Sequence, residues 1–170
     1  MRMETERLIL RRYTADDLQD LYEYLSDAEV VKFEPYKAMQ LDEVRENLTW
    51  RIESDEMIAV ERKSDHKMIG NIYLGKRDFD AFEIGYVFNR NFWGNGYAKE
   101  ACAAVIEDAF RHGAHRIFAE CDPENPNSWK LLETLSFKRE AHFRKSVYFW
   151  TDTAGKPLWK DTYVYAKLNQ

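Results

Sequence analysis

The chain has 170 residues, a length that fits one domain with a substantial core, and we treat residues 1–170 as a single domain. Lys plus Arg number 25 against 30 Asp plus Glu, and this mildly negative balance argues against direct nucleic-acid binding, which normally needs a basic excess. No stretch approaches a membrane-spanning helix, and the two cysteines lack metal-ligand spacing. We therefore expect a reduced, cytoplasmic protein without a metal or a membrane partner.

The first third of the chain predicts one strand followed by two helices. Residues 6–13 form an aliphatic run that is typical of a strand. Thr14, with Asp17 three residues later, resembles a capping box at the start of a helix over 15–27. Residues 29–38 indicate a loop, and an amphipathic helix follows over 42–54. We expect its inner face to carry Val44, Leu48, Trp50 or Arg51, and Ile52.

Strand-like runs dominate the middle of the chain. The first two, 57–63 and 68–77, are joined by a turn at 64–67, and the third covers 82–89. A helix is expected over 97–112, because apolar residues recur there at helical spacing and Gly113 suits its C-terminal cap. That apolar stripe consists of Ala98, Cys102, Val105, Ile106, Ala109 and Phe110.

The last third predicts a strand, a helix and a return to strands. Residues 115–121 alternate as a strand, and Asn125 and Pro126 suit the N-cap and the first position of a helix that ends near Leu135. Further strand-like runs are 137–146, 147–150 and 158–168, with a turn at 153–156.

The expected order is β-α-α-β-β-β-α-β-α-β-β, which is neither regular βα alternation nor all-β. It predicts an α/β (α+β) fold with a mixed, mostly antiparallel twisted sheet of about seven strands and helices on both faces. The strand–helix–strand stretch 82–121 should form a right-handed parallel crossover.

The stretch WGNGYA, residues 93–98, lies between an expected strand and an expected helix. The first N–H groups of a helix have no partner within the helix, and the helix dipole adds partial positive charge there. Gly94 and Gly96 would let the backbone approach an anion closely, and Lys99 could add charge. The pattern therefore indicates a phosphate-binding turn.

Other interpretations of this stretch fit less well. Asn-Gly favours a type I′ hairpin turn, but the residues after Gly96 have helical rather than alternating spacing. The chain has no GxxxxGK[ST] motif, and Lys99 stands where a dinucleotide-binding fingerprint requires its third glycine.

Together with its neighbours, WGNGYA resembles the acetyl-CoA-binding motif of the GNAT acyltransferase superfamily, Gln/Arg-x-x-Gly-x-Gly/Ala. Trp93 departs from its first position, and Trp-Gly-x-Gly-Tyr-Ala is similar to the RimJ/RimL-like branch, which includes ribosomal-protein N-terminal acetyltransferases. METERLILR, EIGYVF, NPNSWKLLETLSF and KDTYVYAKL also fit that branch, and the resemblance covers nearly the whole chain. Ser136 replaces the glycine that usually ends the Asn-x-x-Ser helix.

The resemblance implies a GNAT fold and an acetyl-CoA site. The backbone amides from Asn95 to Lys99 would hold the pyrophosphate, and strand residues 86–88 would run along the pantetheine arm where two strands diverge. Asn125 and Ser128 match the Asn-x-x-Ser positions, although both also suit plain helix-start residues. Trp129 would border the arm or belong to the core. The implied cofactor contacts are Tyr86, Val87, Phe88, Trp93, Gly94, Asn95, Gly96, Tyr97, Ala98, Lys99, Asn125, Ser128 and Trp129.

The resemblance also implies candidate catalytic residues. Glu83 is the candidate general base, with an arginine-paired strand carboxylate as the alternative interpretation. Val147 stands where some relatives carry a glutamate base, so that role is absent here. Ser128 or Tyr148 would protonate the leaving thiolate, and the amide of Val87 or Phe88 would polarise the carbonyl.

An N-acetyltransferase acting on a primary amine is the function implied. An α-amine has a pKa of about 8 against about 10.4 for lysine, so a weak base favours a protein or peptide N-terminus. Small amines such as polyamines or aminoglycosides, and a catalytically silent acyl-CoA-binding module, remain alternatives, and a homodimer is left open. Phe33, Tyr36 and Trp50 are candidate walls of the acceptor site, with a core role as the alternative.

Overall fold

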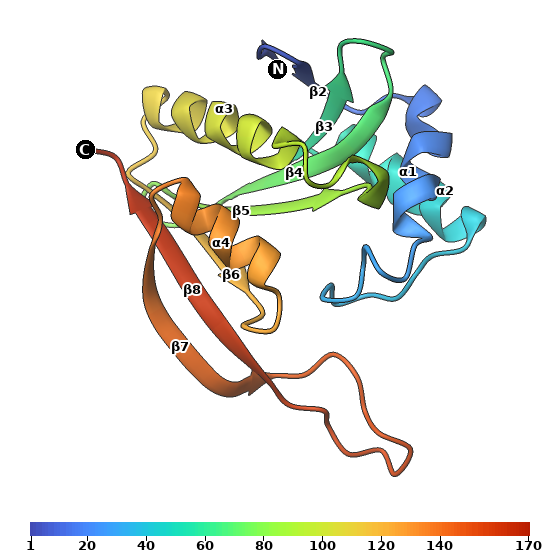
Figure 1. Cartoon of the computed structure of the whole chain (residues 1–170), viewed down its shortest axis with the longest axis vertical. Helices are drawn as coiled ribbons and strands as arrows, with labels where there is room; N and C mark the ends of the chain where they lie inside the picture. The colour runs from blue at the N-terminus through green and yellow to red at the C-terminus, as the bar shows by residue number, and fades with distance from the viewer.

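The computed structural model describes all 170 residues, which form one eight-stranded sheet with four α-helices (Figure 1). The order across the sheet is β1-β2-β3-β4-β5-β6-β8-β7. Every neighbouring pair is antiparallel except β5 and β6, which are parallel. The strands are β1 (Arg2–Glu4), β2 (Leu8–Arg11), β3 (Met57–Arg62), β4 (Met68–Lys76), β5 (Ala81–Phe88), β6 (Arg116–Cys121), β7 (Lys138–Val147) and β8 (Lys160–Leu168).

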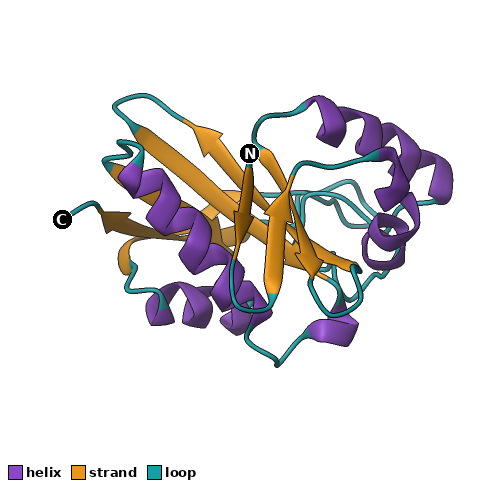
Figure 2. Ribbon diagram, turned by 90° about the horizontal axis from the view of Figure 1, so that it is seen from above, coloured by secondary structure: helices purple, strands orange, loops and turns teal.

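The helices cover the two faces of the sheet in pairs, as Figure 2 shows. The first pair is α1 (Leu18–Leu25) and α2 (Leu41–Glu53), and the second is α3 (Tyr97–Arg111) and α4 (Pro126–Thr134). Because side chains alternate along a strand, each helix pair packs on its own set of strand residues. Two separate hydrophobic clusters result, one on each face of the sheet.

The apolar stripe predicted for α3 forms its buried face. Cys102, Val105 and Ile106 are buried in the same hydrophobic cluster as Ile84 of β5. Gly113 ends the helix with φ of 97°, as its predicted role as a cap requires.

On the other face, α2 turns Val44, Leu48 and Arg51 inward. Trp50, the alternative to Arg51 for this inner position, is 51% exposed. A hydrogen bond from Arg51 Nη1 to the Tyr13 hydroxyl, at 2.9 Å, holds the Arg51 side chain inward. Tyr13 lies far from α2 in the sequence.

The expected element order and the parallel β5–α3–β6 connection are confirmed. The sheet has one strand more than expected, because the short strand β1 pairs with β2. The run 147–150 is not a separate strand: β7 ends at Val147, and residues 148–159 form a long loop closed by a bridge between Thr151 and Pro157. None of the helices is long and apolar enough to cross a membrane.

The strands β5 and β6 pair only at their beginnings. Residues 81–83 pair with 116–118, after which β5 continues beside β4 and β6 continues beside β8. Beyond Glu83, one edge of β5 therefore has no strand neighbour. The expected divergence of two strands is present at this point.

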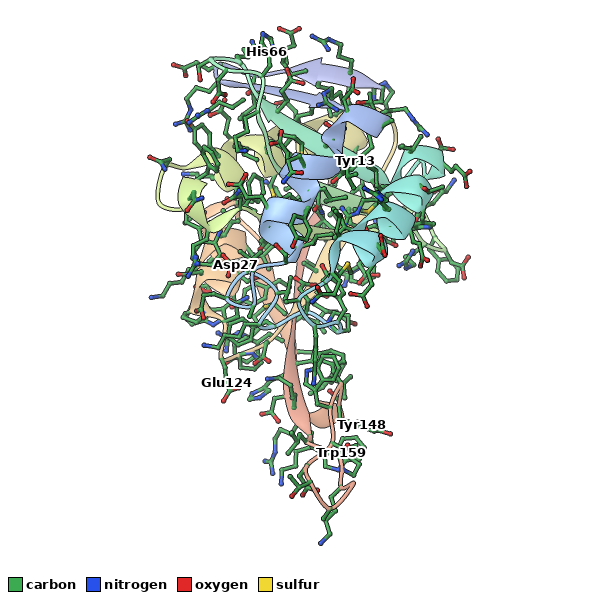
Figure 3. The ribbon with its side chains drawn as sticks, turned by 90° about the vertical axis from the view of Figure 1, so that its right-hand side faces the viewer. Tyr13, Asp27, His66, Glu124, Tyr148 and Trp159 are labelled. Atoms are coloured by element: carbon green, nitrogen blue, oxygen red, sulfur yellow. The ribbon has the colours of Figure 1, made fainter.

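The β7–β8 hairpin extends well beyond the rest of the molecule (Figure 1). Tyr148 and Trp159 lie on this projecting part, far from Tyr13 in the body of the protein (Figure 3). Their rings meet edge to face at 5.1 Å between centroids.

Candidate active site

The gap between β5 and β6 opens into a cleft of about 1000 Å³. Its walls come from both faces of the sheet: the start of α3 and α4 on one side, and α2 with the loop before it on the other. Side chains that lie far apart in the sequence therefore meet around one opening in the sheet.

The predicted phosphate-binding turn lies at one end of the cleft. A short 3-10 turn, Arg90–Phe92, follows β5, and Gly94 and Gly96 both have φ of 78°. This left-handed backbone favours glycine, and a Cβ at Gly94 would meet no protein atom within 4 Å. The backbone N–H groups from Gly94 to Lys99 donate to no backbone carbonyl, so they are free to bind an anion.

Side chains of the turn hold its shape. Trp93 Nε1 donates to the Phe88 carbonyl at the end of β5 at 2.9 Å, which accounts for tryptophan at this position. Asn95 Nδ2 donates to the carbonyls of Phe92 and Trp93, each at 3.1 Å. Of the predicted cofactor residues in this stretch, Trp93, Gly94, Gly96, Tyr97, Ala98 and Lys99 line the cleft. The Asn95 side chain is turned into these local bonds and does not line it.

The start of α4 forms the second part of this end of the cleft. Asn125 occupies the N-cap position before Pro126, but its side chain makes no capping hydrogen bond, and the residue lines the cleft. A plain capping role therefore does not account for its amide group. Ser128 also lines the cleft, and its Oγ lies 3.0 Å from the Tyr86 hydroxyl of β5.

The Tyr86–Ser128 contact bridges the gap between the diverging strands. The Tyr86 hydroxyl donates to the Ser128 carbonyl at 3.0 Å, so Ser128 Oγ can donate to the Tyr86 oxygen. Burial raises the pKa of Tyr86 well above its usual range, so its hydroxyl stays protonated at neutral pH. Two hydroxyl groups thus stand where a proton can be passed to an atom in the gap.

Besides Asn95, two further predicted residues, Trp129 and Tyr148, do not line the cleft. Trp129 Nε1 donates to the Pro123 carbonyl at 3.1 Å, and its ring packs edge to face on Tyr163, as its core interpretation required. Tyr148 is 47% exposed on the projecting hairpin beside Trp159. Tyr86, unlike Tyr148, lines the cleft.

Glu83 lies at the last paired position before β5 and β6 separate. Its Oε2 accepts a hydrogen bond from Arg77 Nη2 at 2.6 Å, which is the ion pair named as the alternative interpretation. By strand alternation its side chain lies on the same face as Val87, the face covered by α1 and α2, and it lines the cleft there.

The opposite end of the cleft has aromatic walls. Phe33, Tyr36 and Trp50 all line it, as predicted for an acceptor site, and Val147 lines it from β7. The loop before α2 reaches the β7–β8 hairpin there, because the Lys160 ammonium lies 5.7 Å from the centre of the Phe33 ring. This end is therefore enclosed by segments from both halves of the sheet.

Carboxylates outnumber cations along the cleft. Those lining it are Glu29, Glu34, Glu83, Glu120, Asp122 and Asp161, and the cations are Arg51, Lys99 and Lys160. Salt bridges join Glu83 to Arg77 and Asp122 to Lys160, each at 2.6 Å.

Glu34 and Glu120 differ from the other carboxylates because their side chains have no hydrogen-bond or ion-pair partner. Burial raises the pKa of Glu34 to about 7, partly offset by the positive charge of Arg51. Burial and the negative charge of Glu83 raise the pKa of Glu120. Two carboxyl groups without a partner therefore line the cleft.

Sequence reasoning did not find Glu34, Glu120 or Arg7, whose guanidinium contacts the glycine turn. Glu34 stands in a loop without periodicity, and Glu120 follows from its strand only once the divergence of β5 and β6 is known. Arg7 is within METERLILR, which indicated a family resemblance but no role for an individual side chain.

Comparison with known proteins relates this architecture to one family. A family model described as an acetyltransferase (GNAT) domain matches residues 7–138. The uncharacterized N-acetyltransferase YnaD of Bacillus subtilis is 32% identical over 176 residues, covering 100% of this chain and 98% of YnaD.

Solved structures agree with the sequence relatives. An acetyltransferase (GNAT family) from Bacillus anthracis is 30% identical and superimposes with a TM-score of 0.91 over 99% of both chains. A ribosomal-protein-S5-alanine acetyltransferase from Vibrio fischeri is 23% identical with a TM-score of 0.81, covering 100% of this chain and 97% of its own. At this lower identity the second structure shows a common fold only.

Proposed function

Because the chain belongs to the GNAT acetyltransferase family, we propose that it moves the acetyl group of acetyl-CoA to a primary amine held at the enclosed end of the cleft. The observation that carries this proposal is the separation of β5 from β6 beside a helix start with free amides. It provides an anion site and a slot for a thioester in one continuous opening.

The residues present fit the cofactor. The amides from Gly94 to Lys99 and the dipole of α3 suit a pyrophosphate, with Gly94 and Gly96 leaving room for it. The free edge of β5 from Tyr86 to Phe88 suits the amide groups of the pantetheine arm, and the uncommitted side chain of Asn125 faces the same space. When bound, acetyl-CoA supplies an activated acyl group.

In the proposed reaction, a bond forms from the amine nitrogen to the acyl carbon and the bond from that carbon to sulfur breaks. The nitrogen loses a proton, for which Glu83 is our candidate acceptor, directly or through water. The sulfur gains a proton from the paired hydroxyls of Ser128 and Tyr86, which lie 3.0 Å apart. A free amide of Val87 or Phe88 on the β5 edge would polarise the carbonyl.

We place the chain in the RimJ/RimL-like branch and propose the α-amine of a protein or peptide as its acceptor. The Trp-Gly-x-Gly-Tyr-Ala form of the turn and the Asn-x-x-Ser helix support this placement. Val147 stands in place of the glutamate base of some relatives, which fits an acceptor whose amine is easily deprotonated.

A small cationic amine is the second candidate acceptor, and the unpaired Glu34 and Glu120 favour it. An ammonium group carries three donors and no acceptor, so it suits the half-buried Glu34 and the exposed Glu120 carboxylates better than a neutral or anionic group would. A diamine or polyamine offers such a group in addition to the amine that reacts.

The experiment measures thiol release from acetyl-CoA with matched pairs of acceptors. These are butylamine against 1,4-diaminobutane, and a peptide with serine at its second position against one with lysine there. Equal rates for the serine and lysine peptides, together with slower rates for butylamine and 1,4-diaminobutane, would support a peptide N-terminus as the acceptor. Preference for the diamine, lost in Glu34→Gln and Glu120→Gln but retained in the exposed control Glu107→Gln, would support the cationic acceptor.

A third outcome would contradict both acceptors. Tight binding of CoA without amine-dependent thiol release from any member of the panel would make the protein a silent acyl-CoA-binding module. CoA that does not bind at all would overturn the proposed cofactor itself.

A further inference from the structure

Arg7 lies in the connection between β1 and β2 and reaches across to the glycine turn. Its Nη1 donates to the Asn95 carbonyl at 2.8 Å, the residue between the two glycines. Its guanidinium carbon also lies 4.4 Å from the centre of the Tyr97 ring. The N-terminal hairpin therefore contacts the centre of the turn and the first residue of α3.

Glu100 fixes the direction of this guanidinium. Arg7 Nε donates to Glu100 Oε2 at 2.7 Å, and the Arg7 backbone N–H donates to Oε1 at 2.8 Å. Thr5 Oγ1 donates to the same Oε1 at 2.6 Å. A planar guanidinium held at several points has little freedom to rotate, so its remaining N–H groups keep a defined direction.

One nitrogen of Arg7 remains without a partner. Nε and Nη1 are occupied, whereas Nη2 donates to no protein atom. This nitrogen lies 3.5 Å from the position that a Cβ on Gly96 would take, so it stands beside the turn whose amides are free. An anion bound to those amides would meet a fixed positive charge from Arg7.

We propose that Arg7 is part of the phosphate-binding site: it holds the glycine turn in its open shape through the Asn95 carbonyl and directs Nη2 at the bound pyrophosphate. This inference rests on the proposed use of acetyl-CoA. It adds to that use a residue that lies 88 positions before Asn95 in the sequence.

A purely structural role accounts less well for these contacts. The Arg7 side chain is 40% exposed and Glu100 is 18% exposed, so the ion pair is only partly buried, and it does not require the bond from Nη1 to the Asn95 carbonyl. Arg12 provides a comparison of similar side-chain exposure, 42%, because it pairs away from the turn with Asp55, which is itself 91% exposed. If Arg7, like Arg12, only joined two segments of the chain, replacing either arginine would have a similar effect on CoA affinity.

The test compares two ligands by calorimetry: CoA, which carries the phosphates, and pantetheine, which has the same thiol arm without them. Arg7→Ala should weaken CoA binding about 10- to 100-fold, the range expected for losing hydrogen bonds to a charged group. Pantetheine binding should change less than twofold. Arg12→Ala should leave both ligands unchanged.

Two further measurements distinguish charge from shape. Arg7→Lys keeps a positive charge but cannot hold Asn95 and Glu100 together, so its CoA affinity should fall between those of the wild type and Arg7→Ala. The CoA affinity of Arg7→Ala should also depend less on salt concentration than that of the wild type. Melting temperatures of the unliganded variants establish that each is folded.

Three results would overturn the inference. Unchanged CoA affinity in Arg7→Ala would remove Arg7 from the site, and an equal loss for CoA and pantetheine would indicate general damage. A loss of the same size in Arg12→Ala would show that the effect is not specific to the turn. Failure of the wild type to bind CoA would instead refute the proposed function, and the two failures are therefore distinguishable.

Discussion

Replacing Glu34 by glutamine should make the protein more stable at alkaline pH. The Glu34 side chain is largely buried in the loop before α2, has no hydrogen-bond partner, and has a pKa raised by burial from 4.5 to about 7. A raised carboxyl pKa means that the folded state binds this proton more tightly than the unfolded state does. Between pH 4.5 and about 7 the wild type therefore loses stability as pH rises.

The size of this loss follows from the two pKa values. At about 1.4 kcal/mol for each pH unit, ionising Glu34 in the folded protein costs up to about 3 kcal/mol above pH 7. Glutamine has nearly the same shape and carries no charge, so the variant escapes this penalty. The advantage of Glu34→Gln should approach about 3 kcal/mol at pH 8 and nearly vanish at pH 4.5.

Urea unfolding at pH 4.5, 6 and 8 measures this difference, with the slope against urea as a check that the same surface is exposed in each protein. Glu107→Gln is the control, because that carboxylate is 75% exposed on α3 and should show no such trend. A Glu34→Gln variant that is no more stable than the wild type at pH 8, or equally more stable at every pH, would refute the reasoning.

Three further predictions follow from the site and its helices. Gly96→Val forces a β-branched residue to φ of 78° and should lower CoA affinity at least tenfold, whereas Gly155→Val places the same strain in the distant hairpin and should leave affinity unchanged; equal affinities in a calorimetric titration would argue against the phosphate site. Glu83→Gln should lower turnover about 100-fold with CoA affinity within twofold, and full activity in the thiol-release assay would remove Glu83 as the base. Ser136→Gly relieves a serine at φ of 66° after α4 and should raise the free energy of unfolding by about 1 kcal/mol without changing activity; a loss of stability in thermal melting would contradict this.

Features governed by neighbours in sequence were predictable from the sequence. The stripe of α3, the glycine turn and the cap at Gly113 each depend on spacing within a few residues, and the structure has all three. The pairing of β1 with the sheet was not predictable, because a strand of three residues has almost no periodicity.

Features governed by distant contacts were not predictable. The choice between Trp50 and Arg51 on the inner face of α2 depends on Tyr13, a partner 38 positions away in the chain. The unpaired state of Glu34 is likewise a property of the assembled cleft, since no spacing rule predicts that a loop carboxylate lacks a cation. Most of the cleft-lining residues that belong to a motif were therefore predictable, whereas Glu34 and Glu120, which belong to none, were not.

The two hydrophobic clusters on opposite faces of the sheet have a consequence for how such a protein can change. The glycine turn and α4 rest on one cluster, while α1, α2 and Tyr36 of the loop between them rest on the other, and the sheet separates the two clusters. Substitutions in the two clusters share few partners, so their effects on stability should add. Under the proposed function, a lineage could therefore exchange one amine for another by altering α1, α2 and the loop between them, while the half that holds acetyl-CoA stays unchanged.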